Sequence, residues 1–292
     1  MIFIRTIWYH FCKNILTLLS DKVFLQLIFF IDFLRFGFKY RILNLTNPKT
    51  FSEKINFLKL YHRNPNGAIL ADKVAVRGFV KDQIGNKYLI PLLGVYNDFS
   101  SIDFDKFPKK FVMKTNHGSG WNFLCVDKNS LNKKHISKNF KRWLSWNAFY
   151  LSREWQYKGI EPKIICEEML QYEIYDYKVY CFHGEPEYIQ IDLNRFSKHE
   201  RIIYDTNWNR QEFSILYPKS SMNIKKPNKL EEMLMISRKL SKELIFSRID
   251  LYLHNDDIFF GEITLHPEGG NCPVVPNSFD GKMADKLNLQ NI

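Results

Sequence analysis

The sequence predicts an α+β fold with two subdomains. Its 292 residues can bury a large core, and this length suits two subdomains better than one. The composition, with 45% hydrophobic and 25% charged residues, is typical of a globular protein. Helix and strand patterns follow one another without the strict alternation of a doubly wound parallel sheet, which favours the α+β class.

The charge balance favours anionic partners. The formal net charge is +11, and residues 1–60 contain nine Lys or Arg against three Asp or Glu. Such a balance suits a nucleotide, a nucleic acid, an acidic polysaccharide or an anionic membrane surface. Nucleic acid is not expected, because the aromatic residues are spread through the chain and are not interleaved with Lys and Arg.

Cysteine and histidine usage argues against disulfides and zinc. The five cysteines are odd in number and contain no C-x-x-C pair, which predicts reduced, buried thiols in the cytoplasm. The eight histidines show no H-E-x-x-H spacing, so a zinc site is not expected.

Residues 1–45 are predicted to form an apolar, basic helical segment. Its longest run without a charge, residues 23–31, is far shorter than the roughly 18 residues that a membrane span needs. No small-residue cleavage site follows a basic start, so a signal peptide is not expected. Two interpretations stay open: the segment packs on the main body, or residues 1–40 make peripheral contact with the inner face of the plasma membrane.

A capping box begins the next predicted subdomain, residues 46–108. Thr50 and Glu53 open a helix that extends to about residue 61, with inward-facing positions Ile55, Leu58 and Tyr61.

A second helix is predicted from about residue 72, ending at Gly85. Lys73 and Arg77 lie on one face of it, and they either form a solvated surface or hold a phosphate. Residues 88–96 predict a strand, and Pro91 places it at a sheet edge.

Residues 111–115 predict a strand that runs into a glycine loop. Gly118 and Gly120 allow backbone N–H groups to approach an anion, and Lys114 adds a positive charge at the strand end. No helix-opening G-K-[ST] follows, so the loop is not a Walker A motif.

The following elements are predicted from periodicity and turn residues. They are a return strand at residues 123–127, a polar helix over 130–150, a buried strand over 163–170, a hairpin of residues 176–182 and 187–193, a helix over 228–244, a glycine-rich loop at 267–271 and a closing helix that includes 285–287.

Two alternating apolar runs predict a further β-hairpin over residues 248–265. A turn centred on Asp256 would pair His254 with Ile258. Counting outward from that pair fixes the expected register of the whole hairpin.

This register places Asp250 opposite Glu262 and Arg248 opposite Thr264, all on one face. Two carboxylates directly across a ladder repel unless a positive charge lies between them. Mg²⁺ is the simplest such charge, because it takes a few carboxylate oxygens and needs no His or Cys. The alternative is a hairpin whose acids point to water.

Five blocks together carry a family resemblance. They are N-P-K-T-F-S-E-K at residues 47–54, A-D-K at 71–73, the run 111–120, D-Y-K-V-Y-C-F at 176–182 and G-E-I-T at 261–264. In this combination the chain resembles ATP-grasp enzymes, and more narrowly their TupA-like branch, which is associated with teichuronopeptide and other bacterial surface polysaccharides. The likeness spans residues 45–287. It implies an ATP-grasp fold in which two α+β subdomains hold ATP, with the core at residues 109–290.

The resemblance also implies a nucleotide site. Contacts to ATP phosphates would come from Lys73, Lys114 and a closing loop formed by Asn116, His117, Gly118, Ser119 and Gly120. Adenine would lie beside Glu167 and Glu168, near main-chain groups of Met169 and Leu170. Asp176 would bind ribose, and Lys178 would face the nucleotide.

The metal ligands implied in this way are Asp250 and Glu262, with Arg248 directed at the transferred phosphoryl group. The third ligand in related ATP-grasp enzymes is commonly Asn, whereas this chain has Thr264. That departure leaves open whether one or two Mg²⁺ ions bind.

The chemistry implied is ATP-dependent amide ligation in capsule or teichuronopeptide-like polysaccharide biosynthesis. A sugar acid or polysaccharide precursor would form an acylphosphate, and an amino acid or other amine would displace the phosphate. Two alternatives stay open: a sugar-modifying kinase or glycosyltransferase-like enzyme, and a non-catalytic nucleotide-binding module.

Overall fold

The computed structural model describes residues 2–36, 42–171, 174–194 and 198–290. Residues 1 and 37–41 of the predicted N-terminal segment therefore lie outside the described residues. The helices are α1 Ile2–Asn14, α2 Asp21–Phe36, α3 Phe51–Tyr61, α4 Gly67–Ala71, α5 Val76–Ile84, α6 Lys133–Leu144, α7 Phe149–Ser152, α8 Leu230–Ser241 and α9 Ser278–Asp285. The strands are β1 Leu92–Tyr96, β2 Phe111–Thr115, β3 Asn122–Cys125, β4 Ile164–Glu168, β5 Asp176–Phe182, β6 Glu185–Leu193, β7 Glu200–Asp205, β8 Ser214–Ile215, β9 Phe246–His254, β10 Asp257–Thr264 and β11 Val274–Val275.

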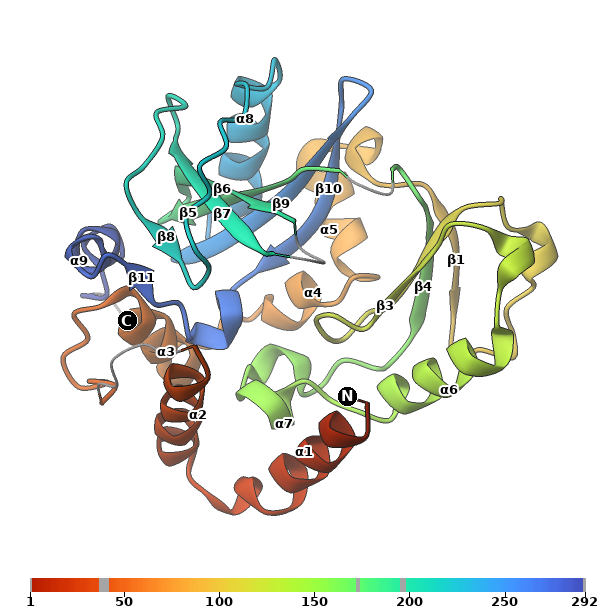
Figure 1. The fold of residues 1–292 in the computed structure, drawn as a ribbon, viewed down its shortest axis with the longest axis horizontal. Coiled ribbons are helices and arrows are strands. Elements are labelled where there is room, and N and C mark those ends of the chain that lie inside the picture. The colour runs from red at the N-terminus through yellow and green to blue at the C-terminus, as the bar shows by residue number, and fades with distance from the viewer. Residues whose placement is uncertain (1, 37–41, 172–173, 195–197, 291–292) are drawn as a thin grey trace.

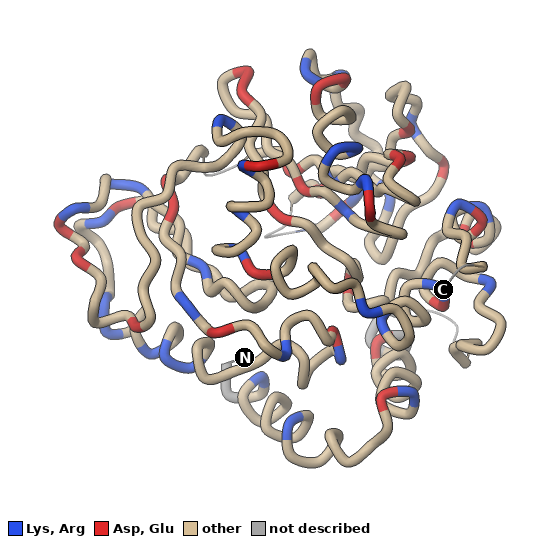
Figure 2. Tube along the Cα trace, turned by 180° about the vertical axis from the view of Figure 1, so that it is seen from behind, with Lys and Arg blue, Asp and Glu red and all other residues tan. Residues whose placement is uncertain are grey.

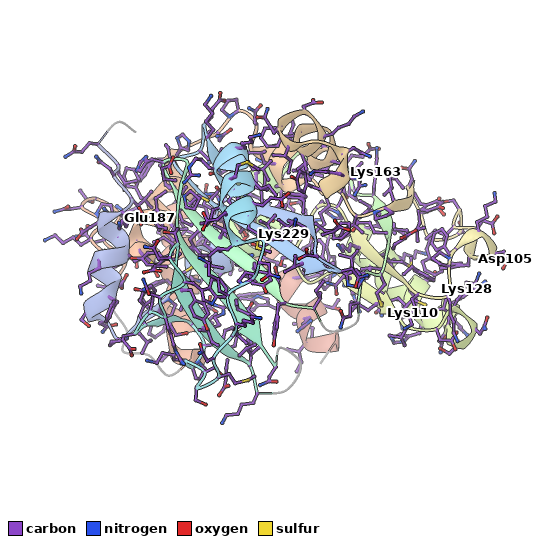
Figure 3. The ribbon with its side chains drawn as sticks, turned by 90° about the horizontal axis from the view of Figure 1, so that it is seen from above. Asp105, Lys110, Lys128, Lys163, Glu187 and Lys229 are labelled. Carbon is purple, nitrogen blue, oxygen red and sulfur yellow. The ribbon has the colours of Figure 1, made fainter. Side chains whose placement is uncertain are left out.

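Two antiparallel sheets form the two lobes of the molecule (Figure 1). The larger sheet has five strands in the order β10-β9-β5-β6-β7, and the smaller has four in the order β1-β4-β2-β3. In a view from above, Asp105, Lys110 and Lys128 mark the outer end of the smaller lobe, whereas Glu187 lies toward the opposite end of the molecule (Figure 3). Because β1 pairs with β4, the strand at the end of the predicted 46–108 region shares a sheet with the core.

The larger sheet is buried on both faces, and the two faces differ in chemistry. Alternate residues of β5, including Val179 and Cys181, join a core with α5 and α8. The residues between them, Tyr180 and Phe182, pack on the other side against Phe51 of α3. On this second face the same strand also presents Asp176 and Lys178, and it therefore carries the charged side chains described below.

The predicted register of the β9–β10 hairpin is confirmed at its acidic pairs and wrong beside the turn. Asp250 pairs with Glu262 and Arg248 with Thr264, but His254 pairs with Asp257. A two-residue turn, Asn255-Asp256, has positive φ at both positions, and a bulge at Gly261 then restores the count.

Close packing favours Gly261 at that bulge. A Cβ there would lie 3.0 Å from the carbonyl oxygen of Asp250 and 3.0 Å from the Tyr252 ring. The bulge shifts the alternation by one residue, so that Phe260 and Ile263 both face the core while Glu262 faces the opposite side.

Three predicted helices begin or end elsewhere. The segment 130–150 forms two helices, α6 and α7, because residues 145–148 leave the helical path. The helix predicted from residue 72 begins at Val76, and Gly85 ends it with φ of 102°. Helix α8 starts at Leu230 without a side-chain cap from Asn228.

The capping box of α3 is confirmed. The Thr50 hydroxyl accepts from the Glu53 backbone N–H, and the Glu53 carboxylate accepts from the Thr50 N–H at 3.0 Å. Ile55 and Leu58 are buried as predicted, whereas Tyr61 is exposed. The polar residues Ser52, Asn56 and Lys59 are also buried on this helix, because they contact the loop after β10 and not water.

Helices α1 and α2 run along the lower edge of the molecule and pack on α7 and the segment before it (Figure 1). The ring of Tyr9 stacks on Trp146 with centroids 4.6 Å apart, and the Arg153 guanidinium binds the Leu16 carbonyl and Asp21. The prediction that this segment packs on the main body is therefore correct for its inner face. None of the described helices is long and apolar enough to cross a bilayer.

Removing the α3 cap tests how firmly this helix is fixed. We expect Thr50→Ala to lower the free energy of unfolding by about 1 kcal/mol, because the Glu53 backbone N–H loses its side-chain acceptor. Urea denaturation measures the change. Thr46→Ala is the control, since that exposed hydroxyl makes no hydrogen bond with the described residues, and an equal loss in both variants would contradict the capping role.

Candidate active site

The β9–β10 hairpin brings four predicted residues into one hydrogen-bonded cluster. Arg248 donates to both Asp250 oxygens at 2.7 and 2.8 Å, to Glu262 at 3.1 Å and to the Thr264 hydroxyl at 3.2 Å. The Thr264 hydroxyl in turn donates to Glu262 at 2.9 Å. Their placement on one face follows from the strand period of two together with the bulge.

Strand β5 adds two charges beside this cluster. Lys178 lies directly across from Asp250 in the sheet, and its ammonium pairs with Asp250 and Asp176. Burial would lower the pKa of Lys178, but the two carboxylates raise it, so the ammonium stays charged. Burial holds the pKa of Asp250 above its ordinary value against the opposing charges of Arg248 and Lys178.

Glu262 is the more accessible acid of the pair. Its side chain is 35% exposed, compared with 3% for Asp250. Burial alone would raise the pKa of Glu262, but Lys73 and Arg248 lower it to about 2. Glu262 is therefore ionised at neutral pH and faces the cavity between the lobes.

Two lysines reach this cavity from the other side. Lys73, just before α5, donates to the Gly118 carbonyl at 2.7 Å, and burial lowers its pKa while the nearby Glu262 opposes that effect. Lys114, at the end of β2, donates to Glu167 at 2.8 Å and lines the same cavity. One cation from the smaller sheet, Lys114, and one from the segment before α5, Lys73, thus face the acids of the larger sheet.

The cavity has a volume of about 570 Å³. The predicted site residues that line it are Lys73, Lys114, Gly118, Ser119, Gly120, Asp176, Lys178, Arg248, Asp250, Glu262 and Thr264. Their convergence from three strands of one sheet and a loop of the other makes this cavity the candidate active site.

Asn116 and His117 do not line the cavity, contrary to the predicted closing loop. Both are fully buried. The Asn116 amide donates to Asp72 and to the Glu161 carbonyl, and His117 Nε2 lies 2.9 Å from the Trp146 carbonyl. These side chains anchor the loop, and only its glycines and Ser119 reach the cavity.

The predicted adenine-binding residues lie outside the lining of the cavity. Glu167 is buried between Arg77 and Lys114, at 2.8 Å from each. Glu168 is exposed at the end of β4, and Met169 and Leu170 follow it in a partly buried segment. Arg77 therefore neither forms a solvated face nor points at a phosphate, because Glu167 and the Ile90 carbonyl engage its guanidinium.

Sequence reasoning missed a second group of residues around the cavity. It comprises Asp32, Lys59, Glu154, Tyr157, Asp192, His199, Arg201, His266, Glu268 and Asn271. One indication was available: Ser52, Asn56 and Lys59 recur at helical spacing on the side of α3 that also carries buried Ile55. Of the others, Glu268 and Asn271 lie in the glycine-rich loop predicted at residues 267–271, and the rest share no sequence motif.

The loop after β10, η6 Pro267–Gly270, owes its shape to α3 and Arg201. Glu268, Gly269 and Gly270 all have positive φ. The Arg201 guanidinium donates to Glu268 and Asp192, and Lys59 and Asn56 donate to the carbonyls of the two glycines. These contacts hold the loop as a wall of the cavity that also contains the acids Asp250 and Glu262.

The donor set suits Mg²⁺. Asp250, Glu262 and Thr264 offer oxygen only, and Mg²⁺ takes one or two carboxylates and fills its remaining positions with water and phosphate oxygens. Three carboxylates, those of Asp176, Asp250 and Glu262, lie beside the cations Lys178 and Arg248. Among the described residues, no group of three or more His, Cys, Asp or Glu side chains forms a self-sufficient metal site.

Solved structures with related folds include several ligases. The chain is 16% identical to D-alanine–D-alanine ligase from Bacillus anthracis, with 75% of this chain and 66% of that chain covered and a TM-score of 0.45. It is 13% identical to N5-carboxyaminoimidazole synthetase from Staphylococcus aureus complexed with ADP, with 68% and 45% covered and a TM-score of 0.39. For the ATP-grasp ligase PsnB the identity is 13%, the covered shares are 76% and 61%, and the TM-score is 0.42.

The chain therefore spans less than two thirds of the length of the second and third of these proteins and about two thirds of the first. No curated protein matches it. The model of the TupA-like ATP-grasp family matches residues 53–288, which is most of the sequence and includes every strand of both large sheets. This match confirms the ATP-grasp fold predicted from the sequence, and the chain belongs to the TupA-like ATP-grasp family of enzymes.

Proposed function

We propose that the protein is an ATP- and Mg²⁺-dependent carboxylate–amine ligase that joins an amino acid to a sugar acid during bacterial surface polysaccharide biosynthesis. The observation that carries this proposal is the convergence of Lys73, Lys178 and Arg248 on the acids Asp250 and Glu262 in one cavity. Such a site neutralises phosphoryl oxygens and offers no activated nucleophilic side chain.

The proposed reaction has two steps. A carboxylate oxygen of the sugar acid attacks the γ-phosphorus of ATP, ADP leaves, and an acylphosphate forms. The neutral amine nitrogen then attacks the acyl carbon, the bond from that carbon to the phosphate oxygen breaks, inorganic phosphate leaves, and the nitrogen loses a proton to solvent. When bound, Mg²⁺ would be held by Asp250 and Glu262, with Thr264 beside them, and would neutralise phosphate charge.

The chain's own residues would position the reactants. Arg248 is fixed by four hydrogen bonds to the hairpin acids and Thr264, so its guanidinium is pre-organised toward the transferred group. Lys73 and the loop of Gly118 and Gly120 lie opposite, where they would contact the triphosphate. The polysaccharide role rests on the family association and on the sequence blocks that carry it.

Hydroxylamine trapping tests the proposal. The protein would be incubated with ATP, Mg²⁺ and hydroxylamine over glucuronate, galacturonate and their nucleotide-linked forms. Hydroxamate formed together with ADP supports the ligase. ADP release with a phosphoester product, identified by its mass, would instead indicate a sugar-modifying kinase, and no ADP with any acid would indicate a non-catalytic nucleotide-binding module.

Substituting the two hairpin acids should separate catalysis from stability. We expect Glu262→Gln to reduce ADP release by about 100-fold or more with little change in the unfolding temperature, since the amide keeps its hydrogen bonds at a partly exposed position. Asp250→Asn should abolish turnover and also cost about 3 kcal/mol of stability, because Arg248 and Lys178 stay buried without their shared partner.

The exposed Asp257→Asn at the hairpin turn is the matched control, and it should retain full activity. Initial rates and thermal unfolding give both quantities on the same samples. Normal turnover of Glu262→Gln would remove that residue from the active site.

We further propose that the outer face of the N-terminal helices contacts an anionic membrane on the cytoplasmic side. Ile4, Ile7, Phe11 and Ile15 are exposed at helical spacing, and Leu18 beyond them is 83% exposed. The α1 helix contains Arg5 and Lys13 and no acidic residue, and blue positions without red ones mark it in Figure 2. An apolar stripe flanked by basic side chains is complementary to an anionic lipid surface.

Vesicle flotation tests this contact. We expect Ile7→Ser/Phe11→Ser/Leu18→Ser to reduce binding to vesicles that contain anionic lipid by about 10-fold or more, because each lost side chain removes apolar burial. The control Ile69→Ser/Met222→Ser/Met235→Ser removes exposed apolar side chains elsewhere. Equal flotation of both triple variants would contradict the proposal, and a concentration-dependent dimer lost only in the first would assign the stripe to a second copy of the chain.

A further inference from the structure

Lys59 is a buried cation that the proposed phosphoryl transfer does not use. It is only 3% exposed, lies on α3 and lines the cavity. Its ammonium donates to the Gly269 carbonyl, and no carboxylate oxygen of the described residues lies within 4.0 Å of it. A lysine ammonium has three donors, so two of them have no protein partner within the described part of the chain.

A buried cation in this state is unfavourable without an anion. Burial lowers the pKa of Lys59 to about 8, although Glu154, Asp32 and Asp21 oppose the shift from a distance. An anionic ligand that enters the cavity would supply the missing partner at close range.

Glu154 faces the same part of the cavity. Its carboxylate accepts from the Ser152 hydroxyl at 2.7 Å and from the Gln156 amide at 3.3 Å, which fixes its orientation. Burial raises the pKa of Glu154, and Lys59 opposes that shift without touching it. Both groups lie beside Gly269, because the Lys59 ammonium donates to its carbonyl and a Cβ at this glycine would lie 4.0 Å from Glu154 Oε2.

Apolar side chains complete this compartment. Leu25 and Ile28 of α2 and Leu151 of α7 line it. The family match begins at residue 53, so the α2 wall lies outside the matched region.

We propose that this compartment binds the amine substrate as a zwitterionic α-amino acid, with its carboxylate on Lys59 and its ammonium beside Glu154. The apolar wall of α2 then contacts the amino-acid side chain. This inference rests on the proposed ligase function for its place in the reaction, and it adds the residues that recognise the amino acid.

The test compares amino acids with amines that lack the carboxylate. Wild-type protein, Lys59→Met and Lys54→Met would each be offered three pairs: alanine and ethylamine, serine and ethanolamine, and lysine and cadaverine. Lys54 is the matched control, because it lies on the same helix and also donates to backbone carbonyls, those of Ala284 and Leu287, but does not line the cavity.

Binding by calorimetry in the presence of ADP and Mg²⁺, and amide formation where it occurs, are the readouts. For at least one pair, we expect wild type and Lys54→Met to prefer the amino acid by about 10-fold or more, and Lys59→Met to lose that preference, because one charge-assisted hydrogen bond is removed. Both members of a pair are measured on the same variant, so a general loss of stability affects them equally.

Hydroxylamine trapping separates this inference from the function on which it rests. Hydroxamate formation is measured on all three proteins, because hydroxylamine replaces the amine and carries no carboxylate for Lys59 to bind. If Lys59→Met keeps the preference, or if wild type shows none in any pair, the inference is overturned while the ligase can stand. If no variant forms hydroxamate but the preference depends on Lys59, the ligase fails and the amino-acid site remains.

Discussion

The buried ion cluster around Asp250 is the interaction on which the site depends. Its carboxylate receives Arg248 from its own strand and Lys178 from the neighbouring strand, so β5 and β9 are tied at the point where the cavity opens. Loss of one member of such a cluster leaves an uncompensated charge, which costs about 3–5 kcal/mol. The hydrogen bonds from Arg248 to Glu262 and Thr264 extend the cluster to β10.

This cluster also explains how the two lobes are coupled. Arg248 and Lys178 both pair with Asp250, whereas Glu262 accepts a single hydrogen bond from Arg248. The negative charge of Glu262 therefore also acts on Lys73. The Lys73 ammonium is attracted by Glu262, and it donates a hydrogen bond to the Gly118 carbonyl of the glycine loop. A ligand that binds between the lobes would therefore enter a space whose opposing charges are already aligned.

Helix α3 has the corresponding role on the other side of the cavity. Its capping box fixes where the helix starts. Its buried polar residues Ser52 and Asn56 then contact the loop that follows β10. The apolar face of the same helix packs on the larger sheet through Phe51. Helix α3 thus contacts both the larger sheet and the η6 loop. Helix α2 contributes Asp32 to the cavity on one face, and its other face is exposed.

The sequence by itself determined the features that depend on local pattern. The capping box at Thr50, the helix stop at Gly85 and the pairing of Asp250 with Glu262 all follow from short-range spacing, and the family blocks identified the fold. The predicted turn was one residue too long and the predicted strand lacked the bulge at Gly261. These two errors in the register cancel, so the predicted pairing of Asp250 with Glu262 is correct. A period of two fixes which face a strand residue takes, but it does not reveal where an extra residue is inserted.

Only the tertiary structure decided which polar residues reach the cavity. Asn116 and Arg77 have the sequence context of ligand contacts, yet both are engaged by distant partners that no local pattern indicates. Lys59 and Glu154 belong to separate elements and come together because α3 and the segment after α7 both lie beside Gly269. Burial and charge pairing are set by long-range packing, whereas periodicity records only the neighbours along the chain.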